Sequence, residues 1–400
     1  MTAADTPLTI TSTGGVISSG AEVDGIDGPE STSASIANAG SVSSAGGYGI
    51  RLVAGGTITN AAGGTITGAS YGIYGSQAPV TVANAGGIAS TGGAGIYLSA
   101  GGSITNAAGG SIAGSRYGVI ISGGAGEVGN AGMVRGGVYL ARGGSLTNDA
   151  GAAIDGGNYG VLVAGGAGTV TNAGRAEATR IGVYLSAGGS ITNTADGSIS
   201  GSVYGVKVSG GRASLTNAGS IGGGGVYFAD GGSVSNTHGG TISGAHYGVF
   251  VGHGSGMVVN AASIISTGGT GLYLQAGGSV TNEAGASIAG ASYGIWVNGG
   301  SGTITNSGTL SGGRYSVLFD DGGPNRLVVA PTAVFKGAVY SSTGAASTLE
   351  LAGGNGSLNG LSEGSGTVVQ NGSWSFSNFQ TISVDAGGDW TLNGGEVRTL

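Results

Sequence analysis

The stretch GTITNAAGGTITGASYGIYG at residues 56–75 decides the fold of this chain of 400 residues. It contains three short apolar segments, centred on Ile58, Ile66 and Ile73, which are separated by turns rich in glycine, alanine, serine and asparagine. Within each segment apolar residues alternate with small or polar ones, as is typical of a β-strand with one buried face. One such unit is too small to bury its own apolar residues, so it needs neighbours of the same kind.

The spacing of the asparagines shows that the unit is repeated. From Asn60 onward every second interval between successive asparagines is 24 residues, and the intervals between are 18–22 residues, so two kinds of unit alternate. A period of this size is the signature of a repeat architecture. The thirteen asparagines, each with an aliphatic residue two positions before it, are Asn38, Asn60, Asn84, Asn106, Asn130, Asn148, Asn172, Asn193, Asn217, Asn236, Asn260, Asn282 and Asn306.

Stacking of successive units turns the three segments into three parallel sheets around one narrow core. We therefore predict an all-β fold, a right-handed parallel β-helix (a three-sided β-solenoid) with about 22–24 residues per coil. An α-helical alternative fails because each glycine costs about 1 kcal/mol relative to alanine inside a helix. We expect an N-terminal coil or cap at residues 1–35, the repetitive β-helix at 36–322 and C-terminal β-helix coils at 323–400.

Composition excludes several other classes of protein. Glycine supplies 95 residues but proline only 5, and the glycines lack the three-residue period of collagen. Apolar residues make up 39%, too many for a disordered chain, and no apolar run approaches the roughly 20 residues of a membrane helix, so we expect a soluble protein. The net charge of −7 offers no basic patch for nucleic acid or anionic lipid, and the absence of cysteine excludes disulfides and thiolate metal sites.

Two columns of the repeat have structural explanations. The asparagines follow a buried aliphatic residue at a turn, where asparagine tolerates a left-handed backbone and its amide can bond the amides of neighbouring coils. A glycine before the third segment, such as Gly72, recurs in twelve successive units and marks a position with positive φ or with no room for a Cβ atom. We expect the tyrosines directly before this glycine, or before its equivalent, to cover a corner of the core: Tyr48, Tyr71, Tyr117, Tyr159, Tyr204, Tyr247, Tyr293 and Tyr315.

A third column is the candidate binding surface. It lies between the two inward aliphatic residues of the third segment, so the strand period of two turns it outward. Eleven of its thirteen members are large apolar or aromatic residues, and an exposed stripe of this kind commonly marks a site that stacks against sugar rings or is buried against another protein. The alternative is that the rings only stack on each other and stabilise the sheet. The candidate binding residues are Tyr74, Tyr97, Tyr139, Tyr184, Tyr227, Phe250, Tyr273 and Trp296, and the column is completed by Arg51, Ile120, Leu162, Lys207 and Leu318.

The sequence offers no constellation of residues for catalysis, and we expect neither an enzyme nor a metal or cofactor. The only histidines, His238, His246 and His253, have a spacing that matches no metal motif and no acidic cluster beside them. No serine nucleophile motif is accompanied by a suitable histidine and acid. Two acidic groups could bind calcium, but the glycine-aspartate nonapeptide of calcium-binding β-rolls is absent. These groups are Glu22, Asp24, Asp27 and Glu30 near the N-terminus, and the pair Asp320 and Asp321.

The C-terminal segment carries motifs of a known family. The asparagine repeat stops, and the chain then reads RLVVAPTAVFKGAV at residues 326–339. It closes with Phe376-x-Asn378-Phe379 and with GGDWTLNG at residues 387–394. This ending resembles the last coils of the passenger domain of bacterial autotransporters, which use type V secretion. The resemblance implies export in an unfolded state, display or release at the outer surface of the cell, and a C-terminal region that helps nucleate folding.

Two parts of an autotransporter precursor are not recognised in the sequence. The first residues, MTAAD, lack the basic and apolar regions of a signal peptide, and the alternating strands of an outer-membrane barrel do not follow the passenger-like segment. We therefore expect either a passenger cut from a longer precursor with an outer-membrane barrel, or a relative that is secreted differently.

These observations together predict a non-enzymatic β-helical adhesin or scaffold, located at the cell surface or outside the cell after passage through the outer membrane. The expected partner is a host or bacterial surface protein or glycan, or a second copy of the chain, and not nucleic acid. Two alternatives stay open. One is a self-associating structural surface fibre, and the other is a β-helical enzyme that acts on polysaccharides.

Overall fold

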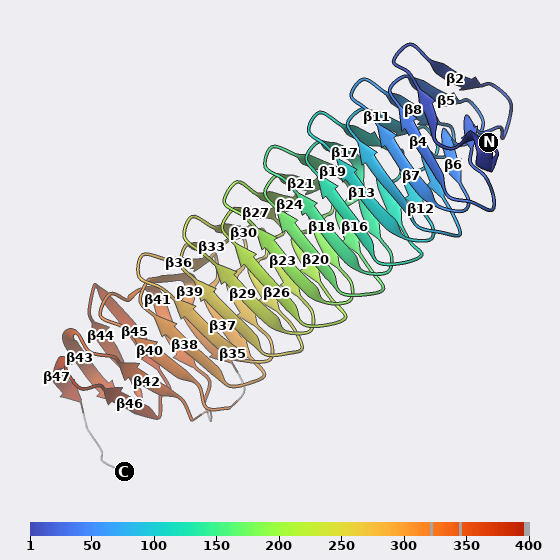
Figure 1. Cartoon of the computed structure of the whole chain (residues 1–400). Coiled ribbons are helices and arrows are strands. Elements are labelled where there is room, and N and C mark those ends of the chain that lie inside the picture. Colours follow the sequence, from blue (N-terminus) through green and yellow to red (C-terminus); the bar gives the residue numbers. More distant parts are fainter. Residues whose placement is uncertain (321–322, 344–345, 396–400) are drawn as a thin grey trace. The chain divides into compact units, whose positions relative to one another are not determined.

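The computed structural model describes residues 1–320, 323–343 and 346–395, and the chain forms two compact units, Met1–Ser202 and Val203–Leu400 (Figure 1). The fold is all-β, with about 60% of the residues in strands that stack as parallel coils, about 14 in total. Within the described ranges the only helical segment is a short 3-10 turn, η1 (Ala3–Asp5), and no helix is long and apolar enough to cross a membrane. The predicted parallel β-solenoid is confirmed.

Each regular coil of the first unit contributes three strand segments, as the repeat predicts. The first segments form one parallel sheet in which successive coils pair in register, for example Ile36 with Ile58 and Asn38 with Asn60. The strands of this sheet are β1 (Leu8–Ile10), β4 (Ala34–Asn38), β7 (Gly56–Asn60), β10 (Val80–Asn84), β13 (Gly102–Asn106), β16 (Gly126–Asn130), β18 (Gly144–Asn148), β20 (Gly168–Asn172) and β23 (Gly189–Asn193).

The second and third segments form two further parallel ladders, as the three-sided repeat predicts, and these two ladders are joined into one sheet. The reason is that β17 (Met133–Leu140) and β19 (Ala153–Val163) run from the second segment into the third without a break and thereby join the two ladders. The second-segment strands are β2 (Gly15–Ser18), β5 (Ser41–Ser44), β8 (Thr65–Gly68), β11 (Gly87–Ser90), β14 (Ser111–Ala113), β21 (Arg175–Ala178) and β24 (Ser198–Gly201). The third-segment strands are β3 (Ile26–Asp27), β6 (Ile50–Leu52), β9 (Ile73–Gly75), β12 (Ile96–Leu98), β15 (Val119–Ile121) and β22 (Ile181–Leu185).

The second unit follows the same plan. Its first segments are β26 (Ala213–Asn217), β29 (Gly232–Asn236), β32 (Gly256–Asn260), β35 (Gly278–Asn282), β38 (Gly302–Asn306), β40 (Arg326–Val329), β42 (Thr348–Leu351) and β46 (Thr381–Val384). Its second segments are β27 (Ser220–Gly223), β30 (Thr241–Gly244), β33 (Ser263–Ser266) and β36 (Ser287–Gly290). Its third segments are β25 (Tyr204–Val208), β28 (Val226–Phe228), β31 (Tyr247–Val251), β34 (Thr270–Leu274) and β37 (Tyr293–Asn298), while β39 (Thr309–Asp320) and β41 (Val334–Ser341) span both segments.

The C-terminal coils combine parallel stacking with an antiparallel meander. β42 stacks in register on β40, and β46 stacks on β42. In contrast, β43 (Asn355–Ser362), β44 (Ser365–Val369) and β45 (Ser373–Ser377) pair antiparallel, and β47 (Asp389–Gly395) pairs parallel with β43. An aromatic cluster fills the core here: the ring centroids of Phe335 and Trp374 are 4.4 Å apart, and Phe376 and Phe379 are buried.

The core consists of three aliphatic rows, as expected. Ile58, Ile66 and Ile73 are all buried, and so are all thirteen aliphatic residues that stand two positions before the repeated asparagines. Complete burial of such a side chain stabilises a fold by about 1.5–3 kcal/mol. Because each coil adds the same small contribution and contacts only its neighbours, stability accumulates along each stack.

The asparagines form the predicted ladder within each unit. The Nδ2 of buried Asn60 donates to Oδ1 of Asn84 over 2.8 Å, and its Oδ1 accepts from Nδ2 of Asn38 over 2.8 Å. Equivalent bonds of 2.7–2.9 Å continue to Asn193 in the first unit and run from Asn217 to Asn306 in the second. The expected left-handed backbone is wrong, since none of these thirteen asparagines has a positive φ. They instead end regular strands.

The glycine before the third segment is required mainly because a side chain does not fit. A Cβ atom on Gly72 would lie 2.6 Å from the carbonyl oxygen of Gly95 and 2.8 Å from that of Ala89. The alternative explanation, a positive φ, applies in two coils, at Gly137 (φ 87°) and Gly225 (φ 74°). The column therefore lets the chain turn closely against the backbone of the next coil.

Candidate binding strip and pocket

Within each unit, the tyrosines of the set Tyr48 to Tyr315 and the outward column from Arg51 to Leu318 lie together on the outer face, and we call them the aromatic strip of that unit. In β31 Tyr247 is half-buried, Gly248 and Val249 are both buried, and Phe250 is again half-buried, so the alternation of the strand breaks at the glycine. Tyr247 consequently faces outward beside Phe250, with ring centroids 5.2 Å apart. The expectation that these tyrosines cover a corner of the core is wrong, because it assumed a straight strand through the glycine.

The structure places each of the eight candidate binding residues in the strip of its unit. Seven of them are half-buried, and Tyr273 is only 8% exposed. The rings cover one another: centroids are 4.8 Å apart in the stacked pair Tyr227 and Phe250, and 4.6 Å apart in Tyr273 and Trp296. The strip is therefore less exposed than a row of isolated outward side chains would be.

From Tyr97 to Tyr293, tyrosine changes sides in the strip from one coil to the next. In the longer unit type it precedes the glycine, as Tyr117 does, and in the shorter type it occupies the outward column, as Tyr139 does. These diagonal partners have ring centroids 5.0–5.9 Å apart in the pairs Tyr71/Tyr97, Tyr117/Tyr139, Tyr159/Tyr184, Tyr204/Tyr227 and Tyr247/Tyr273. This alternation over two coils is present in the sequence. It is not recognised when Tyr117 is assigned to the inner face of the strand, because Tyr117 and Tyr139 are then expected on opposite faces.

Several phenols of the strip hold their protons more tightly than usual. Burial is the main reason that the pKa of Tyr117 lies above its ordinary value, the phenols of Tyr159 and Tyr139 raise it further, and Arg116 opposes the shift. Burial raises the pKa of Tyr48, Tyr71, Tyr204 and Tyr247 in the same way. Their hydroxyls are therefore protonated at neutral pH and can both donate and accept hydrogen bonds.

A pocket opens in the strip of the first unit where one coil is shortened. Between its second and third segments β17 has only Gly136 and Gly137, whereas the preceding coil has five residues at the corresponding place. In the following coil, β19 has the four residues Gly157–Gly160 at the place where β17 has Gly137 alone. The shortcut uses φ angles of 100° and 87° at the two glycines, which residues with a side chain rarely adopt. The missing residues leave a hollow between the two longer corners.

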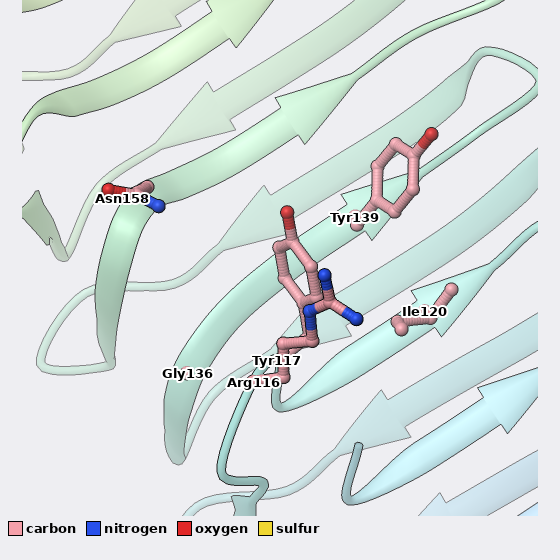
Figure 2. Close-up of a pocket in the computed structure, with 6 residues that line it drawn as sticks. All are labelled: Arg116, Tyr117, Ile120, Gly136, Tyr139 and Asn158. Atoms are coloured by element: carbon pink, nitrogen blue, oxygen red, sulfur yellow. The ribbon is translucent and has the colours of Figure 1, made fainter. Parts of the chain in front are cut away.

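The pocket has a volume of about 420 Å³, within the usual range for small-molecule sites. Arg116 and Asn158 come from the corners of the coils before and after the shortened one. Figure 2 shows Tyr117 and Tyr139 side by side, with Asn158 across the opening. The lining residues are Arg116, Tyr117, Ile120, Gly136, Tyr139 and Asn158.

Arg116 brings a positive charge to the pocket. Arg116 is exposed and forms no ion pair within the described part of the chain, in contrast to Arg51, Arg175 and Arg326, each of which contacts a carboxylate. Arg135, directly before Gly136, is also exposed, but it pairs in register with Asp155 of the next coil, whose carboxylate contacts Arg175. The lining itself therefore contains one charged side chain, the cationic Arg116, in a chain whose net charge is −7.

No group of three or more histidine, aspartate or glutamate side chains is close enough to hold a metal ion within residues 1–320, 323–343 and 346–395. His238, His246 and His253 are exposed, and Nδ1 of His253 lies 3.2 Å from the carbonyl oxygen of Ala229.

The acidic residues near the N-terminus are engaged in local contacts. Asp24 accepts a hydrogen bond from the backbone N–H of Tyr48 over 2.8 Å, and burial raises the pKa of its carboxyl group. Asp27 forms an ion pair with Arg51 at 3.2 Å. Of the second acidic pair, Asp321 lies outside the described residues.

Comparisons with protein-family models, with curated protein sequences and with solved structures found no match. The class of protein is therefore defined by what the chain itself shows. It is a parallel β-solenoid with an aromatic strip on an outer face of each unit and a pocket in the strip of the first unit.

Proposed function

We propose that this protein is a non-enzymatic adhesin or scaffold that uses the aromatic strip as its contact surface. The observation that carries the proposal is that, within each unit, large rings are concentrated on one outward face. The outward positions of the first segments are mostly threonine and serine, such as exposed Thr57 and Thr59, yet these strands stack in register equally well. Coil stacking alone therefore does not account for the rings.

A row of partly exposed rings binds a partner by stacking and by burial of apolar surface. The partner that we propose is a host or bacterial surface protein or glycan. A second copy of the chain is the alternative, because the same rings could be buried in a contact between solenoids.

We also propose that the chain is the passenger of a type V secretion system, displayed at the cell surface or released from it. The support for this is the resemblance of the C-terminal motifs to the last passenger coils of autotransporters. The buried cluster around Phe376 and Phe379 is the kind of local core that a folding nucleus needs. Sequencing the gene beyond both ends of this chain tests the proposal. Coding regions for a signal peptide and a barrel are expected, and a complete gene without the barrel would contradict it.

The binding role is tested with a variant in which five outward tyrosines become serine: Tyr97, Tyr139, Tyr184, Tyr227 and Tyr273. The matched control changes five exposed outward threonines of the first segments to serine: Thr59, Thr105, Thr147, Thr216 and Thr281. Binding to a glycan array and to intact cells is measured for both proteins, and light scattering records their mass at increasing concentration.

The tyrosine variant is expected to lose binding at least about tenfold, since each ring contact is worth about 0.5–1.5 kcal/mol, while the threonine control keeps it. Loss of concentration-dependent association in the tyrosine variant alone would identify a second copy as the partner. Equal binding by the wild type and both variants would show that the strip only stabilises the sheet, and the proposal would be wrong.

A further inference from the structure

The pocket at Gly136 has a composition that points to one kind of ligand. We propose that it binds one ring of an acidic polysaccharide, a hexuronic acid unit. This inference rests on the proposed binding function and adds the chemistry of the ligand to it. The pocket lies entirely within the first unit, so every residue that it uses belongs to Met1–Ser202.

The apolar part of the pocket suits the face of a sugar ring. The rings of Tyr117 and Tyr139 have centroids 5.6 Å apart and planes tilted by 32°, and the side chain of Ile120 lies beside them in the lining. A pyranose ring presents C–H groups on its face, and these pack against aromatic and aliphatic side chains. The volume of about 420 Å³ leaves room for one such ring together with part of its neighbours in a chain.

The polar part of the pocket suits the edge of a sugar ring. Four polar side chains surround the apolar lining: the phenols of Tyr117 and Tyr139, the carboxamide of Asn158 and the guanidinium of Arg116. A pyranose carries hydroxyl groups around its edge and can pair with donors and acceptors on several sides at once. A phenylalanine side chain of a protein partner would offer these groups no hydrogen bonds, and a tyrosine or tryptophan would offer only one polar group, whereas polar groups that lose water without a new partner oppose binding.

The positive charge of Arg116 favours an acidic sugar ring over a neutral one. Arg116 has no carboxylate partner in the described residues, and exposed Arg135 adjoins the pocket through Gly136. A guanidinium group binds a carboxylate through two parallel hydrogen bonds, which are stronger than bonds between neutral groups. The C6 carboxylate of a hexuronic acid supplies that partner, and glucose or galactose does not.

The pocket is a particular product of this corner and not a general feature of the strip. A second shortened corner occurs in the other unit, where Gly222–Gly225 stand opposite six residues of the following coil. There Lys207 lies over the rings of Tyr204 and Tyr227, with its Nζ 5.8 and 5.9 Å from the two centroids. No cation lies over the rings of Tyr117 and Tyr139 among the cation–π contacts of the described residues.

The test uses a tetrasaccharide of glucuronic acid and the same tetrasaccharide after its carboxyl groups have been reduced to alcohols. Binding to the full chain is measured by calorimetry at 25 °C. The wild type should bind the acidic form at least about tenfold more tightly, as expected for a charge-assisted pair. Arg116→Gln should remove this preference by weakening the acidic form much more than the neutral form, whose hydroxyl groups the glutamine carboxamide can still bind. Arg142→Gln removes an equally exposed arginine outside the lining and should change nothing.

A second variant tests the pocket by its shape. Inserting Gly-Ala-Ser after Gly136 restores the length of a regular corner, as in Gly68–Ser70, and should abolish binding of both tetrasaccharides. Circular dichroism and thermal unfolding show whether the insertion variant keeps its fold. If the insertion variant does not fold, Tyr117→Leu tests the pocket instead. This substitution should weaken binding of both tetrasaccharides about 3- to 10-fold.

The proposal is overturned if the wild type binds neither tetrasaccharide, or if Arg116→Gln keeps the preference for the acidic form. Binding of cells or glycans through the strip, without binding of either tetrasaccharide, would leave the proposed function standing and reject only the acidic sugar. Loss of both kinds of binding would reject both.

Discussion

Replacing Asn106 by alanine removes one complete step of the ladder in the first unit. Asn106 is fully buried, and its Nδ2 donates to Oδ1 of Asn130 over 2.8 Å and to the carbonyl oxygens of Gly110 and Met133 over 3.2 and 3.3 Å. Its Oδ1 accepts from Nδ2 of Asn84 over 2.7 Å. The two hydrogens of Nδ2 are shared among three acceptors, so the change removes the equivalent of about three hydrogen bonds, about 3 kcal/mol at about 1 kcal/mol each.

Asn306, at the end of the ladder in the second unit, is the matched control. Its Oδ1 accepts from Nδ2 of Asn282 over 2.9 Å and from the backbone N–H of Gly308 over 3.2 Å, but its own Nδ2 is buried without a partner. Asn306→Ala therefore loses two bonds, about 2 kcal/mol, and also removes a buried donor whose lack of a partner costs about 1–3 kcal/mol. The expected net change is within about 1 kcal/mol of zero.

Amide hydrogen exchange of the first-segment strands measures the opening free energy coil by coil, which suits a protein whose stability accumulates locally. Asn106→Ala should lower this free energy by about 3 kcal/mol in β13 and its neighbours, and Asn306→Ala should leave β38 nearly unchanged. A loss below about 1 kcal/mol at Asn106, or equal losses at both positions, would refute the view that the ladder bonds stabilise the stack.

Two further predictions concern the strip and the glycine column. Because burial raises the pKa of Tyr117 in the folded protein, its contribution to stability is complete below the ordinary phenol pKa of about 10 and is lost as pH rises through the raised value. Urea unfolding between pH 8 and 11 should show this loss, and Tyr117→Phe should show a shallower one; identical slopes would contradict the prediction. Gly72→Ala should destabilise the fold by about 1–3 kcal/mol, because its Cβ would lie 2.6 Å from a carbonyl oxygen, whereas Gly129→Ala, with no atom within 4 Å of the new Cβ, should cost less than about 0.5 kcal/mol. Equal melting temperatures for the two alanine variants would show that the glycine column is not set by space.

The parallel solenoid could be predicted because its evidence is the spacing of residues along the chain. Ile58, Ile66 and Ile73 are buried as their alternation indicates, and Asn60 bonds its neighbours as its period indicates. Residues at equal positions in successive units meet when units stack, so a ladder seen in the sequence becomes a ladder in space.

The orientation of Tyr117 could not be predicted by the same rule. Alternation holds only along a straight strand, and at Gly118 the chain turns so that the glycine and the next residue, Val119, are both buried. This turn moves Tyr117 from the expected inner face to the outer one, where it meets Tyr139 of the next coil.

The sequence by itself determined the period, the three aliphatic rows, the asparagine ladder and the position of the outward rings, because each depends on local spacing. Only the tertiary structure decided that two columns merge into one strip and that a pocket opens within it. The shortening at Gly136 and Gly137 is visible in the sequence, but its effect depends on Arg116 and Asn158. Those two residues are 42 positions apart in the chain and line the same hollow only because the coils that carry them lie on either side of the shortened one.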